Sequence, residues 1–408
     1  MRQLFWASFC PVLDRVSLLD HSSEKETHVL VAPTGWSEDA LQYRRHHLAR
    51  YLIEYRAAEI IWIYPRALAP ARLKREPFKV ERSGGALMEV GIADYRGTVQ
   101  NLDFLQAPIL GKLQKAFLQG HENYLWYTYP AFSELSRFSW QGVFYDCSDN
   151  WSEAGKRGLF KALFFRAIKG RLIERTEKKI VRKVEKVFVT SSFLQEKVAE
   201  NYGAGSVLIE NGVDVNLFQT RINSADRPPW AGFNEKLLGF VGGMKSWKVD
   251  FKLLENVARA RPKWGIVLIG PFYGEPSRQF SRLVDMENVY WSGLVQPEEL
   301  PGYLCELDVG ILPYQENKYN RAVFPLKLFE YLACGLPVVG CGLPSTLGHV
   351  KEGIYWHTAS RAELFIQGCE QAIKWIDNKE ERLAAAAEAD WRKKFDCMLT
   401  LARGAENG

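Results

Sequence analysis

The sequence FPLKLFEYLACGLPVV occupies residues 324–339 and predicts a helix followed directly by a strand. Pro325 suits the first turn of a helix, and apolar residues recur after it at helical spacing. Gly335 suits the position just past a helix, where the backbone often turns left-handed, and the closing pair of valines favours a buried strand. We therefore expect a helix over 325–334 and a strand over 336–340.

Short apolar runs alternate with helical stretches on both sides of this segment. Alternating strands and helices indicate an α/β fold with a mostly parallel sheet. Further helices are expected over 249–260 and 297–304. Strands are expected over 27–33, 60–64, 143–146 and 187–190, and again over 237–241, 265–269, 289–292 and 308–312.

Two adjacent prolines in the segment 225–232 interrupt both periodicities and indicate a linker between two domains. We expect an N-terminal domain over 1–222 and a C-terminal domain over 223–385, each a Rossmann-like, doubly wound parallel sheet. The segment 386–408 is predicted to be helical and able to pack back on the N-terminal domain. Ligands of such folds bind at the carboxyl ends of the strands, so a cleft between the domains is the expected site.

The composition is that of a large folded protein. The chain has 408 residues, of which 47% are hydrophobic and 25% charged, and this profile excludes a mainly disordered chain. Its seven cysteines are scattered without a CxxC pair or a His/Cys cluster, so neither a disulfide framework nor a metal site is expected. The sequence contains no apolar run near 18 residues and no signal-peptide pattern, which predicts a cytoplasmic protein that does not span a membrane.

The basic residues are concentrated in one segment. The formal net charge is +5, whereas residues 153–186 alone carry +8 and the rest of the chain therefore −3. Apolar and basic residues recur there at helical spacing, which fits either a helix on an anionic membrane surface or a core-facing helix with a solvated basic side. No motif for reading nucleic acid accompanies the charge, so no nucleic-acid partner is expected. On the membrane interpretation, the residues that face the membrane are Arg157, Phe160, Lys161, Phe164 and Lys169.

Lys327 and Glu330 are candidates for binding a nucleotide diphosphate and its ribose. A helix N-terminus presents free N–H groups to an anion, Lys327 adds a positive charge, and Glu330 lies on the same face as an acceptor for hydroxyl groups. The alternative is a solvated ion pair on an amphipathic helix. The turn Gly242–Gly243 follows the strand over 237–241, and it either lets a phosphate approach the backbone or is required for steric reasons alone.

Several motifs together resemble the GT-B glycosyltransferases, in the order in which that family uses them. The resemblance covers roughly residues 28–345. It implies a GT-B fold in which an acceptor-binding N-terminal domain and a nucleotide-sugar-binding C-terminal domain face a cleft. The motifs are YDCSDNW at 145–151, Glu177, VFVTSS at 187–192, NGVD at 211–214, Gly242–Gly243, VGILPY at 309–314 and PLKLFEYLACGLPVV at 325–339.

Two departures weaken the resemblance to the retaining branch of that family. The retaining enzymes carry a Glu where this chain has Ala322, and an Arg where it has Gly243. The pattern, together with QYRRHHL at 42–48, is closer to the inverting xanthan-type glucuronosyltransferases and to teichuronic acid biosynthesis glycosyltransferases. That resemblance implies that Asp149 is the general base. It further implies that the nucleotide is lined by Gly242, Gly243, Met244, Tyr314, Lys327 and Glu330.

Several roles stay open between a functional and a structural interpretation. Asp149 is either the base or the N-cap of the next helix, and Asp146, the rival base, is expected to hydrogen-bond within its domain. The segments 66–100 and 271–287 are expected to be loops that determine the sugar and the acceptor. Four residues of the first helix either contact an anionic acceptor or form the polar side of that helix, namely Arg44, Arg45, His46 and His47.

The expected function is transfer of a sugar, with glucuronic acid favoured, from a UDP-sugar to a lipid-linked or bacterial cell-envelope polysaccharide precursor. One carboxylate base and cations that hold the departing diphosphate suffice for inversion, so no metal and no cofactor besides the donor substrate are expected. The enzyme is expected to be peripheral on the inner face of the cell membrane. The alternatives are a retaining transferase, a sugar-nucleotide epimerase, and a catalytically inactive partner that binds membrane and nucleotide. No G-x-G-x-x-G follows the first strand, which argues against a nicotinamide dehydrogenase.

Overall fold

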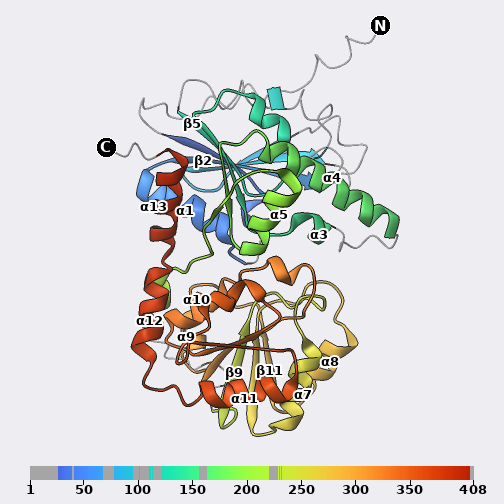
Figure 1. Ribbon diagram of the computed structural model, residues 1–408, viewed down its shortest axis with the longest axis vertical. Helices are drawn as coiled ribbons and strands as arrows, with labels where there is room; N and C mark the ends of the chain where they lie inside the picture. The colour runs from blue at the N-terminus through green and yellow to red at the C-terminus, as the bar shows by residue number, and fades with distance from the viewer. Residues whose placement is uncertain are drawn as a thin grey trace.

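The computed structural model describes residues 26–38, 41–67, 78–94, 101, 110–111, 113, 122–155, 163–219, 228, 230 and 232–404. These residues form two α/β domains that are stacked along the long axis of the molecule (Figure 1). None of the helices in this part of the chain combines the length and the hydropathy that a membrane span needs.

The described part of the N-terminal domain is built on an eight-stranded sheet in the order β3-β4-β2-β1-β5-β6-β7-β8. All neighbouring strands are parallel except β3 and β4. The strands are β1 (Thr27–Val31), β2 (Glu59–Ala67), β3 (Phe78–Arg82), β4 (Leu87–Asp94), β5 (Asn123–Tyr127), β6 (Gly142–Cys147), β7 (Lys186–Val189) and β8 (Val207–Leu208). The helices are α1 (Arg44–Arg56), α3 (Trp151–Gly155), α4 (Leu163–Val181), α5 (Ser192–Tyr202) and α6 (Val215–Gln219).

The described part of the C-terminal domain has a six-stranded, all-parallel sheet in the order β11-β10-β9-β12-β13-β14. The chain runs from β9 outward to one edge and then returns to β12, so the strand order reverses between β9 and β12, where ligands of such sheets bind. The strands are β9 (Lys236–Val241), β10 (Trp264–Ile269), β11 (Val289–Gly293), β12 (Val309–Pro313), β13 (Val338–Cys341) and β14 (Tyr355–Thr358). The helices are α7 (Phe251–Ala260), α8 (Arg278–Val284), α9 (Leu300–Leu304), α10 (Lys327–Ala333), α11 (Ala362–Ala372) and α12 (Lys379–Glu388), and they are followed by α13 (Trp391–Ala402), which packs on the N-terminal domain.

Strands that are covered on both faces explain the apolar runs in the sequence. In β1, Val29 and Val31 belong to the core on one face of the sheet, and Leu30 belongs to the core on the other. The strand β10 is buried along its whole length. The prediction of two α/β domains with mostly parallel sheets is therefore confirmed.

Five strands lie outside the predicted ranges, namely β3, β4, β5, β8 and β14. The strand β4 is buried throughout, but Glu89 and Gly91 interrupt its apolar pattern. The Glu89 carboxylate is tolerated there because it accepts a hydrogen bond from the Trp36 backbone N–H at 2.8 Å. The prediction of loops is therefore wrong for the β3 and β4 part of 66–100, and for the α8 part of 271–287.

Helix α13 ties the C-terminus to the N-terminal domain. Trp391 and Phe395 lie in one apolar core cluster with Leu48 and Leu52 of α1. Figure 1 shows α12 and α13 along one side of the molecule, spanning both domains. Most of the predicted linker 225–232 lies outside the described residues.

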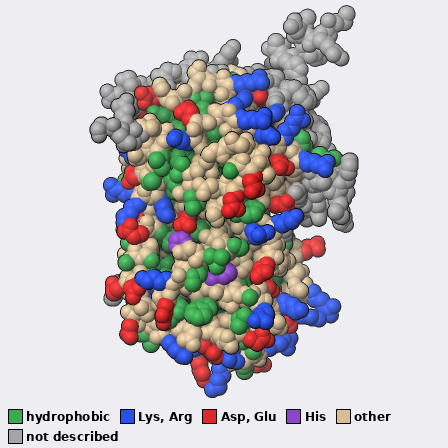
Figure 2. Space-filling model, in the orientation of Figure 1, with side chains coloured by type: hydrophobic (Ala, Val, Ile, Leu, Met, Phe, Trp, Pro, Cys, Tyr) green, Lys and Arg blue, Asp and Glu red, His purple; other side chains and the backbone are tan. Residues whose placement is uncertain are grey.

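Helix α4 presents an exposed basic face. Arg171, Arg175 and Lys178 of the helix and Arg182 just after its end follow one another at helical spacing, and all four are exposed, whereas residues on the opposite side, such as Ile180, are buried. Figure 2 shows Lys and Arg side chains gathered on the side of the N-terminal domain where Figure 1 places α4.

Of the residues predicted to face a membrane, Lys169 is half-buried on α4. The others fall where the structure gives no description of the side chain, namely Arg157, Phe160, Lys161 and Phe164.

Candidate active site

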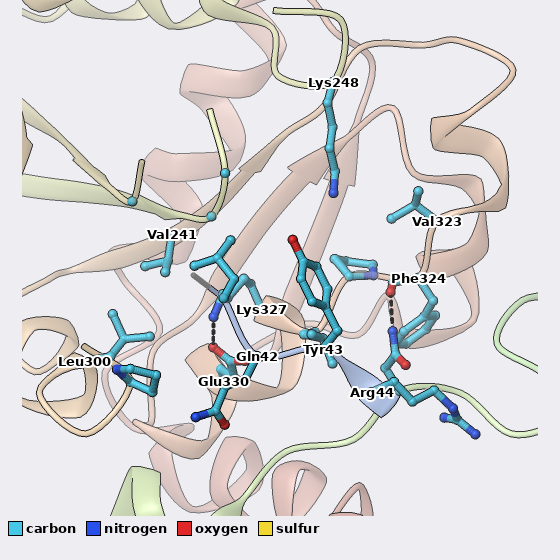
Figure 3. Close-up of a pocket in the computed structure, with 18 of the residues that line it drawn as sticks. Gln42, Tyr43, Arg44, Val241, Lys248, Leu300, Val323, Phe324, Lys327 and Glu330 are labelled. Carbon is cyan, nitrogen blue, oxygen red and sulfur yellow. Dashed lines mark hydrogen bonds and ion pairs between the residues drawn. The ribbon is translucent and has the colours of Figure 1, made fainter. Parts of the chain in front are cut away.

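A cavity of about 190 Å³ lies between the two domains, beside the carboxyl ends of their strands (Figure 3). Its volume is below the roughly 300–1,000 Å³ of typical small-molecule sites. The N-terminal domain contributes the segment 41–45, His47, Ser148, Asp149 and Asn211. The C-terminal domain contributes the turns after β9 and β10, Tyr314, Tyr319 and residues at the start of α10.

Two glycine turns line the cavity on the side of the C-terminal domain, which is called the donor side below. Gly242 after β9 and Gly270 after β10 have φ angles of +153° and +133°, where side chains are strained. A Cβ atom on Gly270 would lie 2.2 Å from the Gly242 carbonyl oxygen, so the two backbones can approach only as glycines. At Gly243 a Cβ atom would lie 2.6 Å from the Tyr273 ring. The glycines therefore leave exposed backbone where a ligand can approach closely.

Tyr331 fixes α10 relative to the first of these turns. Its hydroxyl accepts a hydrogen bond from the Val241 backbone N–H at 2.8 Å. Its ring lies against Gly310 of β12, where a Cβ atom would approach it to 2.5 Å. The sequence shows Gly310 in a predicted strand and Tyr331 in a predicted helix, but it does not show that the Tyr331 hydroxyl reaches the Val241 backbone.

Lys327 and Glu330 line the donor side of the cavity and form an ion pair with each other (Figure 3). Glu330 is 7% exposed and Lys327 is half-buried, so this pair lies in the cavity wall and is not the solvated surface pair that the sequence left open. Helix α10 has seven residues and begins at Lys327, so the predicted start at Pro325 is wrong by two residues. Gly335 follows the helix with a φ of +77°, as predicted.

Asp149 lies on the opposite wall, directly after β6. Its Oδ1 accepts a hydrogen bond from the Tyr319 hydroxyl at 2.7 Å, and among the described residues no backbone N–H of α3 donates to this side chain. Burial raises the pKa of Asp149, whereas the hydrogen bond from Tyr319 and the nearby Lys248 ammonium lower it. The pKa of Lys248 is lowered by burial and raised by the Asp149 charge. Figure 3 shows Lys248 and Tyr43 pointing toward one another across the cavity.

Asp146, the rival base, is held inside the N-terminal domain as predicted. It is 1% exposed, and both of its carboxylate oxygens accept hydrogen bonds from Arg44 Nε, at 2.9 and 2.8 Å. Arg44 Nη1 also donates to the Glu210 carbonyl at 3.0 Å. Arg44 forms part of the cavity wall, but these bonds give its guanidinium a structural role rather than the expected acceptor contact.

The remaining residues predicted for the acceptor lie in different environments. Arg45 and His47 line the cavity, and the Arg45 guanidinium lies 4.5 Å from the centre of the Tyr43 ring. Burial lowers the pKa of His47 to about 3, so its imidazole is neutral at physiological pH.

His46 does not line the cavity. Its ring is 3% exposed and packs between Trp36 and Trp62, at centroid distances of 4.9 and 5.1 Å. The structure therefore corrects the expectation that His46 contacts the acceptor, because its buried ring packs against these two tryptophans and is not among the residues that line the cavity.

Two further donor-side predictions have different outcomes. Tyr314 lines the cavity. Met244 does not, since its side chain is fully buried in the core of the C-terminal domain. Its backbone instead joins the two glycine turns, because Met244 N donates to the Pro271 carbonyl at 2.9 Å and Met244 O accepts from Tyr273 N at 3.0 Å.

Among the charged side chains that line the cavity, cations outnumber carboxylates. Arg44 is paired with Asp146, and Lys327 with Glu330. The other charged residues of the lining are the cations Arg45, Lys245 and Lys248 and the carboxylate Asp149. Such a field favours anionic ligands. Within the described ranges, no group of three or more His, Cys, Asp or Glu side chains could hold a metal ion.

The sequence is similar to known glycosyltransferases. Residues 235–374 match the family model described as Glycosyl transferases group 1. Over 394 residues the chain is 34% identical to TuaH of Bacillus subtilis (strain 168), whose name assigns it to teichuronic acid biosynthesis as a glycosyltransferase. The match covers 92% of this chain and 96% of TuaH.

Solved structures show the same fold at low sequence identity. The sucrose-phosphate synthase from Thermosynechococcus elongatus has a TM-score of 0.69 and 16% identity, covering 93% of this chain and 98% of its own. The Anabaena protein HepE in complex with UDP has a TM-score of 0.62 and 14% identity, covering 92% of this chain and 100% of its own. These likenesses confirm the predicted fold of two Rossmann-like domains facing a cleft.

Proposed function

We propose, for a chain that belongs to the group 1 glycosyltransferases and has the GT-B fold, that the cleft binds a UDP-sugar and transfers its sugar to a glycan acceptor. The observation that carries the proposal is the position of Asp149 on one wall of the cavity and of Lys327 and Glu330 on the other. A carboxylate that can act as a base and a cation that can hold the departing diphosphate, on opposite sides of one cleft, suit inverting glycosyl transfer from a nucleotide. HepE, which has the same fold, was crystallised with UDP.

The donor-side residues have distinct roles in this proposal. The turn Gly242–Gly243 offers backbone to the diphosphate, and Lys327 turns from Glu330 to a phosphate oxygen when the nucleotide binds. Glu330 is then available to accept hydrogen bonds from the ribose hydroxyls. The additional cations of the cavity favour a donor with a second anionic group, as in UDP-glucuronate.

Asp149 is the proposed general base of an inverting reaction. It takes the proton of the acceptor hydroxyl while the acceptor oxygen forms a bond to the anomeric carbon. The bond from that carbon to the diphosphate breaks, and its electron pair leaves on the diphosphate, which Lys327 stabilises. The reactants of this step are the acceptor hydroxyl and the UDP-sugar, and its products are the glycosylated acceptor and UDP.

The surroundings of Ala322 support inversion over retention. Ala322 stands where the retaining branch carries a Glu. Its side chain is fully buried in a core cluster of the N-terminal domain, and its carbonyl accepts a hydrogen bond from Ser191 Oγ at 2.9 Å. This position does not line the cavity, so it offers no carboxylate to the donor sugar.

The acceptor is proposed to be a lipid-linked precursor of a cell-envelope polysaccharide, reached from the inner face of the cell membrane. The name of TuaH supports a teichuronic acid as the product. The exposed basic face of α4, defined by Arg171, Arg175, Lys178 and Arg182, supports peripheral contact with anionic lipid.

Lys327→Ala is expected to weaken UDP binding by about 10–100-fold, because a charge-assisted hydrogen bond to the diphosphate contributes about 1.5–3 kcal/mol. Binding is measured by calorimetry and thermal shift with UDP, UDP-glucuronate, UDP-glucose, UDP-N-acetylhexosamines and GDP-mannose. Lys263→Ala removes an exposed lysine of the same domain and serves as the matched control. UDP binding that is equally tight in Lys327→Ala would exclude this residue from the donor site.

Reversing two charges on α4, in Arg171→Glu/Arg175→Glu, is expected to weaken binding to vesicles containing phosphatidylglycerol by about 30-fold or more. Each basic residue near an anionic surface contributes about 1 kcal/mol. Arg278→Glu/Arg282→Glu on α8 makes the same change in net charge on the other domain, and its vesicle binding is expected to stay near that of the unchanged protein. Cosedimentation measures both, and equal losses in the two variants would contradict a specific role for α4.

A further inference from the structure

One hydrogen bond crosses the cleft from the donor-binding domain to the proposed base. The Tyr319 hydroxyl donates to Asp149 Oδ1 at 2.7 Å. Tyr319 lies between β12 and α10 in the C-terminal domain, whereas Asp149 follows β6 in the N-terminal domain. The contact therefore depends on the two domains being as close together as they are here.

Tyr319 is held rigidly within its own domain. Its ring is 9% exposed and meets the Trp247 ring edge-on, with centroids 4.7 Å apart. The neighbouring Asn320 is fully buried, and its side-chain amide donates to the carbonyls of Lys248 and Gln315 at 2.9 and 2.7 Å. These bonds fix the loop that carries Tyr319 to the segment that carries Lys248.

The N-terminal domain also donates two hydrogen bonds to the loop that carries Tyr319. Ser191 Oγ, at the start of α5, donates to the Ala322 carbonyl at 2.9 Å. Asn211 Nδ2 donates to the Phe324 carbonyl at 2.7 Å. Both donors belong to the motifs of the N-terminal half, VFVTSS and NGVD, to which the proposed chemistry gives no other role. The loop from Tyr319 to Phe324 thus docks on the N-terminal domain at three points.

Resting on the function proposed above, we infer that Tyr319 is a positioning residue that orients the Asp149 carboxylate from the opposite domain, so that closure of the cleft completes the base. Tyr319 holds Oδ1, and no described residue hydrogen-bonds to Oδ2. Oδ2 is then the atom that takes the acceptor proton. Tyr319 does not take it, because burial and the Asp149 charge raise the pKa of its hydroxyl well above the usual value and keep it a donor.

The test compares Tyr319→Phe with Asp149→Asn and with the unchanged protein. Aspartate side-chain carboxyls are labelled with ¹³C, and the resonance missing from Asp149→Asn identifies Asp149. Loss of a hydrogen bond to the ionised carboxylate is expected to raise the pKa of Asp149 by about one pH unit in Tyr319→Phe. The rate of UDP release from UDP-glucuronate should fall by about tenfold or more. The acid limb of the pH profile of this rate should move to higher pH by the same shift as the pKa of Asp149. Tyr290→Phe, elsewhere in the C-terminal domain, should leave both properties unchanged.

The outcomes separate this inference from the proposed function. An Asp149 pKa that is unmoved in Tyr319→Phe would overturn the inference, whatever the activity. Faster UDP release in Tyr319→Phe would also overturn it, because the hydrogen bond would then block the base rather than orient it. If Asp149→Asn keeps full activity, the proposed base is wrong, while the carboxyl titration still reports whether Tyr319 controls Asp149.

Discussion

Replacing Asp149 by Asn is expected to lower the rate of sugar transfer by about 10²–10⁴-fold, the contribution typical of a general base. Asparagine has nearly the same shape and still accepts a hydrogen bond from Tyr319 through its amide oxygen, but it cannot take the acceptor proton. UDP binding should be unchanged, because Lys327 and Glu330 lie on the opposite wall. Transfer is measured as UDP release in the presence of membranes that supply acceptor, and binding by calorimetry.

Asp377→Asn makes the same chemical change at an exposed position of the C-terminal domain and is the control. The anomeric configuration of the product, read by NMR, separates an inverting from a retaining reaction in the same assay. Full transfer activity in Asp149→Asn would exclude this carboxylate as the base, and retention of configuration would exclude the inverting mechanism.

The environment of Asp149 favours function at the expense of stability. Because burial raises its pKa above the unfolded value, the protonated form is favoured in the folded protein. The ionised form therefore lowers the free energy of unfolding once the pH rises above the unfolded pKa, and no such loss occurs at low pH. Asp149→Asn removes the charge, so we expect it to be no less stable than the unchanged protein at neutral pH. Sites tuned for catalysis commonly show this opposition.

The rule that ligands bind at strand ends was sufficient to place the main elements of the candidate site. The runs ending near Val241 and Cys147 predict strands, and the residues that follow, Gly242 and Asp149, do meet at one cavity. Local spacing also predicts which face of α10 carries Lys327 and Glu330. These features depend on contacts within one supersecondary unit, which sequence periodicity reports.

Features that depend on contacts between distant segments were not predictable in this way. Tyr319 reaches a carboxylate 170 positions away in the sequence, and no local pattern marks it. Met244 directly follows two cavity residues, yet its side chain lies in the core of the C-terminal domain. His46 lies between two cavity residues on α1, yet its ring packs against Trp36 and Trp62. The spacing of such residues predicts which helix, strand or turn they belong to. It does not predict where a side chain points when the residue lies in a loop or in the first turn of a helix.

Glu177, which belongs to the family-like motifs, illustrates the same limit. It is fully buried and accepts hydrogen bonds from the Tyr145 and Tyr202 hydroxyls at 2.7 and 2.6 Å, and from Lys197 Nζ at 2.8 Å. This network joins β6, α4 and α5 beneath the strand that leads to Asp149. Its contribution is therefore to fix the position of that strand, away from the cavity itself.

Arg44→Ala is expected to lower the free energy of unfolding of the N-terminal domain by about 3–5 kcal/mol, because it leaves the Asp146 charge buried without a partner. Asp146 and Arg44 are 1% and 3% exposed, and Arg44 Nε contacts both carboxylate oxygens. The guanidinium also lies 5.7 Å from the ring centres of Trp391 and Phe395, so its loss loosens α13 as well. Urea unfolding followed by tryptophan fluorescence measures the change.

The controls for Arg44 separate a buried ion pair from a surface one. Arg56, on the same helix, pairs with Asp396 at a position where both side chains are more than a third exposed, so Arg56→Ala should change stability by less than about 1 kcal/mol. The double variant Arg44→Met/Asp146→Leu removes both charges together and should recover most of the stability lost in Arg44→Ala, since an apolar pair needs no compensation. If Arg44→Ala and Arg56→Ala were equally mild, the Arg44 pair would not hold α1 to β6. Arg44 would then be free to contact an anionic acceptor from the cavity wall.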